Sequence, residues 1–73
     1  MGKNGKGKEY FSIRGELKFE GEYLNGKRNG KCKEYDYDKL IFEGEYLNGK
    51  KNGKGKEYDI KGRLIFEGKY LYG

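Results

Sequence analysis

The amino-acid sequence predicts an all-β fold: a single-layer antiparallel meander of about six strands, built from stacked β-hairpins. Three observations predict it. A long phrase, FEGEYLNGKxNGKxKEY, occupies residues 19–35 and again 42–58, and partial copies stand at both ends of the 73-residue chain. Apolar and polar residues alternate with a period of two inside the first half of each copy, as they do in a strand. Asn-Gly pairs, which favour tight turns, separate the two halves of each copy.

The spacing of the copies locates the strands and the turns. FEGEY begins at Phe19 and Phe42, and FEGKY begins at Phe66, so the period is 23 to 24 residues, as in repeat architectures. The copies differ in length only between the tyrosine of KEY and the next phenylalanine, where eight, six and seven residues intervene. Such variation marks turns, because strand interiors must keep their register. We expect strands near 5–11, 17–24, 30–36, 40–47, 53–59 and 64–71.

The glycines of the phrase indicate how one sheet could hold many large rings. Strands lie about 4.8 Å apart, so rings on alternate strands are roughly 10 Å apart, and a glycine between them leaves bare backbone for a ring to cover. The expected aromatic face comprises Phe19, Tyr23, Phe42, Tyr46, Phe66, Tyr70, Tyr10, Tyr35 and Tyr58, and the repeat glycines are Gly21, Gly26, Gly44, Gly49 and Gly68. For Tyr58 to reach the glycine face, its strand GKGKEY needs a one-residue bulge, which we expect.

The composition limits the class of protein. Forty per cent of the residues are charged and the net charge is +5, but eight tyrosines at recurring positions argue against disorder. Cys32 is the only cysteine, so no internal disulfide can form. No apolar run approaches the length of a membrane span, and no secretory signal precedes the repeats. We expect one soluble, cytoplasmic domain over residues 1–73.

No set of residues supports catalysis, and we expect neither enzymatic activity nor a cofactor. The chain has no histidine to serve as a base. Cys32 stands where other copies have Gly7 and Gly55, which suggests a small structural residue. Asp36 and Asp38 place two carboxylates at a turn, without the further ligands that a calcium site needs.

Basic residues gather around the Asn-Gly turns. The windows 2–8, 26–33 and 49–56 hold 11 of the 17 Lys and Arg residues and none of the 12 acidic residues. Because equivalent turns of a meander line one edge, this pattern predicts a basic rim. Its candidate anion-binding residues are Lys27, Arg28, Lys31, Lys50, Lys51 and Lys54. The rim could attract anionic lipid head groups or acidic protein surfaces, or it could keep the hairpins soluble and pair with neighbouring glutamates. Nucleic acid is the least favoured partner, because the rings are needed for the core.

The phrase G-x-L-x-F-E-G-x-Y-x-N-G-K-x-N-G at residues 15–30 resembles a MORN repeat, in the variant form found in bacteria and some protists. Three imperfect copies cover nearly the whole chain. Tyr72 departs from the pattern, because other copies have Asn25 and Asn48 there. The resemblance implies stacked β-hairpins and a scaffolding or interaction role, with lipid head groups as a further proposed ligand. It offers no catalytic residue.

These observations predict a non-enzymatic protein–protein interaction or assembly scaffold that acts through its aromatic face and open edges. The alternative is an anion-binding module that uses the basic rim. The last strand keeps its apolar pattern, without the polar cap that repeat arrays usually need. We therefore expect self-association into a homodimer or a larger symmetric assembly. The phrase is interrupted at both ends, GKNGKGKEY and FEGKYLYG, which suggests a piece of a longer array.

Overall fold

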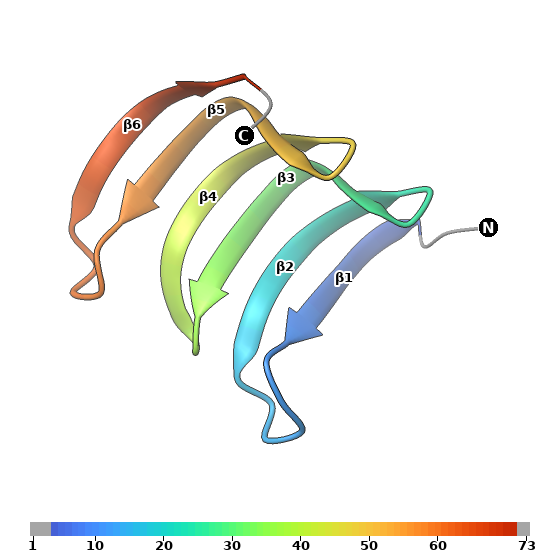
Figure 1. The fold of residues 1–73 in the computed structure, drawn as a ribbon, viewed down its shortest axis with the longest axis horizontal. Helices are drawn as coiled ribbons and strands as arrows, with labels where there is room; N and C mark the ends of the chain where they lie inside the picture. Colours follow the sequence, from blue (N-terminus) through green and yellow to red (C-terminus); the bar gives the residue numbers. More distant parts are fainter. Residues whose placement is uncertain (1–3, 72–73) are drawn as a thin grey trace.

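The computed structural model describes residues 4–71, which form six strands in a single antiparallel sheet (Figure 1). The strands are β1 (Gly5–Tyr10), β2 (Leu17–Leu24), β3 (Lys27–Asp36), β4 (Lys39–Leu47), β5 (Lys50–Tyr58) and β6 (Leu64–Tyr70). Their order in the sheet is their order in the sequence, and residues 4–71 contain no helix. The prediction of a six-stranded meander is confirmed, although β3 and β5 begin three residues earlier than expected.

The Asn-Gly pairs have two different structural roles. Asn25-Gly26 and Asn48-Gly49 form the turns before β3 and β5, with positive φ at both residues, as type I′ hairpin turns require. The second pair of each phrase lies inside a strand. There the side chain of Asn29 accepts a hydrogen bond from the backbone N–H of Asn48 at 3.0 Å, so it holds the next turn in place. The side chain of Asn4 does the same for Asn25 at 2.7 Å.

A row of small residues crosses the whole sheet at one level. In the register of the strands, Gly7 pairs with Gly21, Gly21 with Cys32, Cys32 with Gly44, Gly44 with Gly55, and Gly55 with Gly68. A Cβ atom at Gly55 would lie 2.7 Å from Cε1 of Phe42 and 2.8 Å from Cε1 of Tyr70. The rings therefore lie directly over glycine backbone, which explains why the phrase repeats these glycines.

Aromatic rings from alternate strands form a continuous zigzag over this row. The sequence of contacts is Tyr23–Phe19–Tyr46–Phe42–Tyr70–Phe66, each edge-to-face, with ring centroids 5.5 to 6.0 Å apart. Phe19 and Phe42 are 0% and 1% exposed, and Tyr23, Tyr46 and Cys32 are also buried around them. Phe66, on the last strand, is 44% exposed. The zigzag is thus covered in the middle of the sheet and open at β6.

The expected position of the KEY tyrosines is wrong. The register shifts between Glu57 and Tyr58, but the extra residue lies on the neighbouring strand, since Tyr58 pairs with Leu64 and Glu57 with Phe66. The same shift occurs between Glu9 and Tyr10 and between Glu34 and Tyr35. Each KEY strand thus keeps its alternation, with the glutamate on the aromatic face and the tyrosine on the other. Accordingly, the hydroxyls of Tyr35 and Tyr58 donate to Glu20 and Glu43, which lie on the opposite face.

Candidate functional site

Cationic side chains cover the buried phenylalanines of the aromatic face. The guanidinium carbon of Arg28 lies 3.9 Å from the centroid of the Phe19 ring and 5.7 Å from that of Tyr46. One repeat later, Nζ of Lys51 lies 4.3 Å from the centroid of Phe42 and 5.5 Å from that of Tyr70. Both contacts have cation–π geometry. Arg28 and Lys51 stand at equivalent positions of the phrase, so the cover repeats with it.

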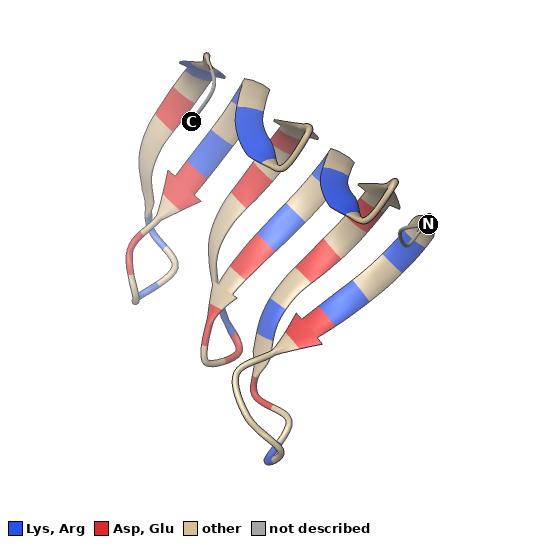
Figure 2. Ribbon diagram, turned by 45° about the vertical axis from the view of Figure 1, so that its right-hand side comes forward, with Lys and Arg blue, Asp and Glu red and all other residues tan. Residues whose placement is uncertain are grey.

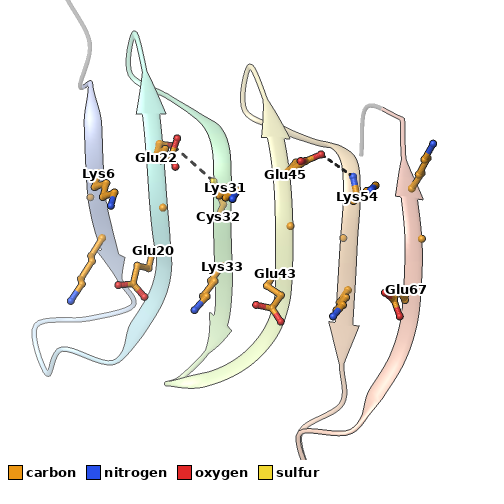
Figure 3. A pocket seen from close by; sticks show the side chains of 18 residues that line it. Lys6, Glu20, Glu22, Lys31, Cys32, Lys33, Glu43, Glu45, Lys54 and Glu67 are labelled. Carbon is orange, nitrogen blue, oxygen red and sulfur yellow. Dashed lines mark hydrogen bonds between the residues drawn. The ribbon is translucent and has the colours of Figure 1, made fainter.

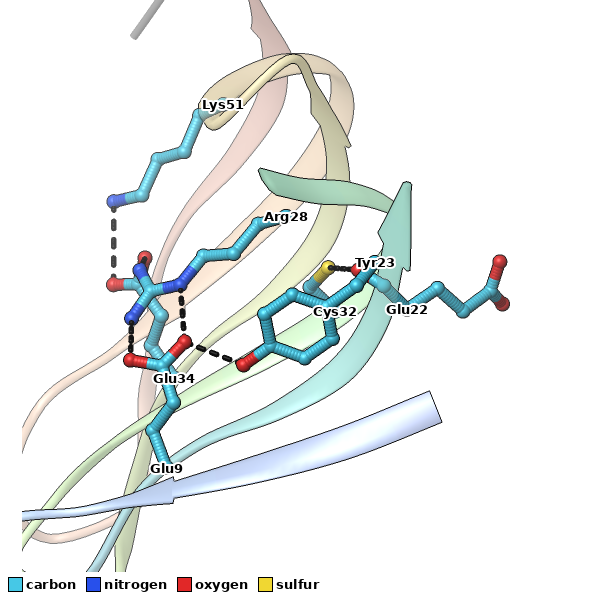
Figure 4. A network of polar contacts seen from close by, with 7 residues as sticks. All are labelled: Glu9, Glu22, Tyr23, Arg28, Cys32, Glu34 and Lys51. Atoms are coloured by element: carbon cyan, nitrogen blue, oxygen red, sulfur yellow. Dashed lines mark hydrogen bonds and ion pairs between the residues drawn. The ribbon is translucent and has the colours of Figure 1, made fainter. Parts of the chain in front are cut away.

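Glutamates hold these cations in place (Figure 4). Glu9 accepts hydrogen bonds from Nη2 and Nε of Arg28, at 2.8 and 3.1 Å, and another from the hydroxyl of Tyr23. Glu34 lies 3.7 Å from Nη1 of Arg28 and 3.9 Å from Nζ of Lys51. The hydrogen bond from Arg28 lowers the pKa of Glu9, whereas burial and the bond to Glu9 raise the pKa of Tyr23 to about 12. The rings of Phe19 and Phe42 are therefore each covered by a cation that a glutamate holds in place.

The corresponding position on β6 lacks such a cover. The hydroxyl of Tyr70 donates to Glu57, as that of Tyr23 does to Glu9. Within residues 4–71, however, no Lys or Arg lies over the ring of Phe66. Phe66 contacts the ring of Tyr70, whereas Phe19 and Phe42 each contact two tyrosine rings and a cation. A further strand beside β6 would supply the missing neighbours.

The six residues of the expected basic rim lie on three different surfaces. Lys27 and Lys50 are exposed where β3 and β5 begin. Arg28 and Lys51 are half-buried over the rings. Lys31 and Lys54 point to the opposite face of the sheet, where they line a groove. The rim divides because these residues belong to strands, in which successive side chains point to opposite faces.

On the opposite face lies an open groove of about 1270 Å³, which is lined by lysines, glutamates, glycines and Cys32 (Figure 3). Figure 2 shows the bands of basic and acidic residues along the strands. One of the two charged rows of the groove alternates along the register from Lys8 to Glu20, Lys33, Glu43, Lys56 and Glu67, one residue from each strand, whereas Lys54 faces Lys69 in the other row. Opposite charges that face each other across neighbouring strands attract, so the alternating row supports the sheet. Each lysine of the alternating row has a glutamate beside it, which offsets its attraction for a free anion.

The two edges of the sheet differ in chemistry. β6 and the residue after it carry large exposed apolar side chains, namely Leu64, Ile65, Phe66 and Leu71. β1 carries glycines and exposed lysines, Lys6 and Lys8. An edge strand leaves backbone N–H and C=O groups unpaired, and an apolar edge is prone to pair with another strand. β6 is therefore the edge more prone to pair with a further strand. β1 has the charged character of an edge that is protected from aggregation.

Sequence reasoning missed two groups of residues. It did not pair Arg28 with Glu9, although the Glu of KEY and the basic residue after the turn recur in register, which is a usable signal. It also missed a stacked pair at the other end of the strands, Phe11 on Tyr37, with centroids 4.2 Å apart and planes 7° apart. Both rings lie in the segments where the copies differ, so the repeat gave no signal for this contact.

Cys32 and Asp38, the candidates for chemistry, both make contacts that support the fold. Burial raises the pKa of the Cys32 thiol, which donates to the backbone oxygen of Glu22 at 3.9 Å, and a protonated buried thiol is a poor nucleophile. Asp38 accepts a hydrogen bond from the backbone N–H of Leu17 at 2.7 Å. The part of the chain between residues 4 and 71 contains no group of three or more His, Cys, Asp and Glu side chains that could hold a metal ion. It also contains no helix long and apolar enough to cross a membrane.

An open, single-layer sheet of stacked hairpins with a repeated ring, glycine and charge pattern defines a β-hairpin repeat protein. The family model described as MORN repeat matches residues 19–40 and 42–62, which is more than half of the chain. The chain therefore belongs to the MORN repeat family, as the resemblance of its phrase predicted. No curated protein and no solved structure showed a significant match.

Proposed function

We propose that this protein is a non-enzymatic scaffold that binds a protein partner by strand addition at β6. The observation that carries this proposal is the incomplete cover of Phe66, on an edge strand that also exposes Leu64 and Ile65. Strand addition joins main-chain hydrogen bonds to side-chain contacts on alternate positions. The inner rings are already covered, so the aromatic face is accessible to a partner chiefly at this edge.

The inner junctions indicate what the partner strand should contain. Beside β4, strand β5 places Glu57 opposite Phe42, Lys56 opposite Glu43 and Gly55 opposite Gly44. β6 presents the same series, Phe66, Glu67 and Gly68. A matching partner strand therefore carries a small residue, a lysine and a glutamate in succession, preceded by a cation that can reach Phe66. The proposal includes a cytoplasmic location, which a chain with one buried, unpaired cysteine suits.

An anion-binding module has less support. Lys31 and Lys54 share their groove with glutamates, and Arg28 is engaged by Glu9. Of the six candidate rim residues, only Lys27 and Lys50 combine exposure with a position beside the hairpin turns. Binding of the chain to vesicles that contain phosphoinositides, if it occurred, would fall steeply with salt and would be lost on changing both residues to alanine.

A peptide with the sequence of residues 50–59, KKNGKGKEYD, tests the proposed edge. Added to the full chain labelled with ¹⁵N, it should shift the backbone amide resonances of β6 and leave those of β3 in place. A scrambled peptide of the same composition controls for charge, and Phe66→Ala should weaken binding of the matched peptide. Equal shifts with both peptides, or shifts confined to the lysines and glutamates of the groove, would refute strand addition at β6.

A further inference from the structure

We infer that the strand which completes β6 is β1 of a second copy of this chain, so that copies join head to tail. This inference rests on the proposed function, since it names the partner of the same edge. It commits to a pairing between unlike edges, unlike the symmetric assembly that the sequence suggested.

The register inside the sheet sets the rule for such a junction. Neighbouring hairpins meet at β2–β3 and at β4–β5, and both junctions pair Phe with Glu, Glu with Lys and Gly with a small residue. Phe19 pairs with Glu34, Glu20 with Lys33 and Gly21 with Cys32 at the first; Phe42 pairs with Glu57, Glu43 with Lys56 and Gly44 with Gly55 at the second. The third junction would bring Phe66, Glu67 and Gly68 of one copy against Glu9, Lys8 and Gly7 of the next. β1 thus carries the required residues in the required antiparallel order.

Charge and burial favour this junction. The alternating row of the groove begins with Lys8 on β1 and ends with Glu67 on β6, so the two edges carry opposite charges at this level. In this row, a junction between copies continues the alternation of charge. It also gives Phe66 the neighbours that leave Phe19 and Phe42 0% and 1% exposed. In the sequence, Lys3 stands at the position of Arg28 and Lys51, although it lies outside the described residues.

Pairing of β6 with β6 of a second copy does not meet the packing rule of the sheet. On the aromatic face, the ring-bearing strands β2, β4 and β6 alternate with β1, β3 and β5, which place Gly7, Cys32 and Gly55 beside them, and the rings of Phe42 and Tyr70 both lie over Gly55. Two copies of β6 side by side would put Phe66 next to Tyr70 with no such strand between them. β1 supplies Gly7, and the resulting contact joins unlike surfaces. An assembly of unlike surfaces continues in one direction unless it closes into a ring.

Sedimentation velocity over a concentration series, from about 1 µM to about 1 mM, tests the assembly. The weight-average mass should rise beyond that of a dimer as concentration increases. Lys8→Glu and Glu67→Lys should each place like charges at the junction and weaken association on the order of tenfold. An equimolar mixture of the two variants should recover association. In the mixture, the glutamate introduced into one variant faces the lysine introduced into the other, while the unchanged Lys8 and Glu67 meet at the next junction.

Lys33→Glu is the matched control, since Lys33 lies in the same row but on an inner strand. It should leave association unchanged, and circular dichroism should show all three variants folded. A mass that stops at the dimer and does not respond to Lys8→Glu would indicate β6–β6 pairing and overturn the inference. A monomer at every concentration would also overturn it. In either case the peptide experiment still decides strand addition at β6 independently.

Discussion

The guanidinium carbon of Arg28 lies over the ring of Phe19, 3.9 Å from its centroid. It thereby shields this buried ring on the side that would otherwise face water. In most domains a second layer of helices or strands performs this task. Here the extent of the described residues along their shortest axis is only 14 Å, and charged side chains from the neighbouring strand cover the rings. A chain with 40% charged residues can therefore have a core, because part of its charge serves as the cover.

Arg28→Ala should lower the free energy of unfolding by about 1–2 kcal/mol, since it exposes Phe19 and removes the main partner of Glu9. Arg28→Lys should cost less, because Lys51 holds the equivalent place over Phe42. Urea denaturation followed by circular dichroism measures both. If the alanine and lysine variants match the parent, the cation does not contribute to the stability of the core.

Phe42→Ala and Phe66→Ala should differ strongly, although both residues stand at the same position of the repeat. Phe42 is 1% exposed, so Phe42→Ala should lower the free energy of unfolding by about 3 kcal/mol, close to the whole stability of so small a domain. Phe66 is 44% exposed, so Phe66→Ala should lower the free energy of unfolding of the monomer by about 1 kcal/mol or less. The comparison is made at low protein concentration, where self-association cannot bury Phe66. Equal losses would show that the two rings are equally buried in solution.

Gly44→Val should destabilise the centre of the sheet by about 2 kcal/mol or more. A Cβ atom there would lie 2.5 Å from the backbone oxygen of Lys54 and 2.7 Å from Cα of Gly55, so β4 and β5 would have to separate. Leu47→Val, on the same strand but exposed, should stay within about 0.5 kcal/mol of the parent. Thermal unfolding of the two variants decides the matter, and a cooperative transition of Gly44→Val at the parental temperature would contradict the close approach.

The sequence predicted the features that depend on one strand or one turn at a time. Alternation within FEGEY located Phe42 and Tyr46 on one face, and Asn48-Gly49 marked a hairpin. The side of the sheet on which Tyr58 lies depends instead on two strands, because the extra residue opposite it belongs to β6. Counting along GKGKEY could not reveal that.

The residues of the predicted basic rim lie on different surfaces of the sheet for a related reason. The basic windows were taken to be turns, whereas β3 already includes Lys27 and Arg28. Once inside a strand, successive residues point to opposite faces. The cover over Phe19 then depends on which residue of β3 lies opposite Tyr23, and this register is a property of the folded sheet.

Tyr23 should make the stability of the protein fall as the pH rises in the alkaline range. Burial, together with the hydrogen bond to Glu9, raises its pKa from 10 to about 12. A group whose pKa is higher in the folded state contributes its stability fully below its unfolded pKa and loses it as pH rises through the folded value. The free energy of unfolding should therefore fall between pH 10 and about 12. Burial also raises the pKa of Tyr70, which adds to the same fall.

Tyr23→Phe should flatten part of this fall, because the variant has no phenolic proton to lose at that position. At neutral pH it should cost on the order of 1 kcal/mol, since Glu9 loses one hydrogen-bond donor but keeps Arg28. Urea denaturation at a series of pH values from 8 to 12 measures both effects, with Tyr37→Phe as the control at an exposed tyrosine. Identical slopes for the parent and Tyr23→Phe above pH 10 would show that the Tyr23–Glu9 contact does not link proton release to unfolding.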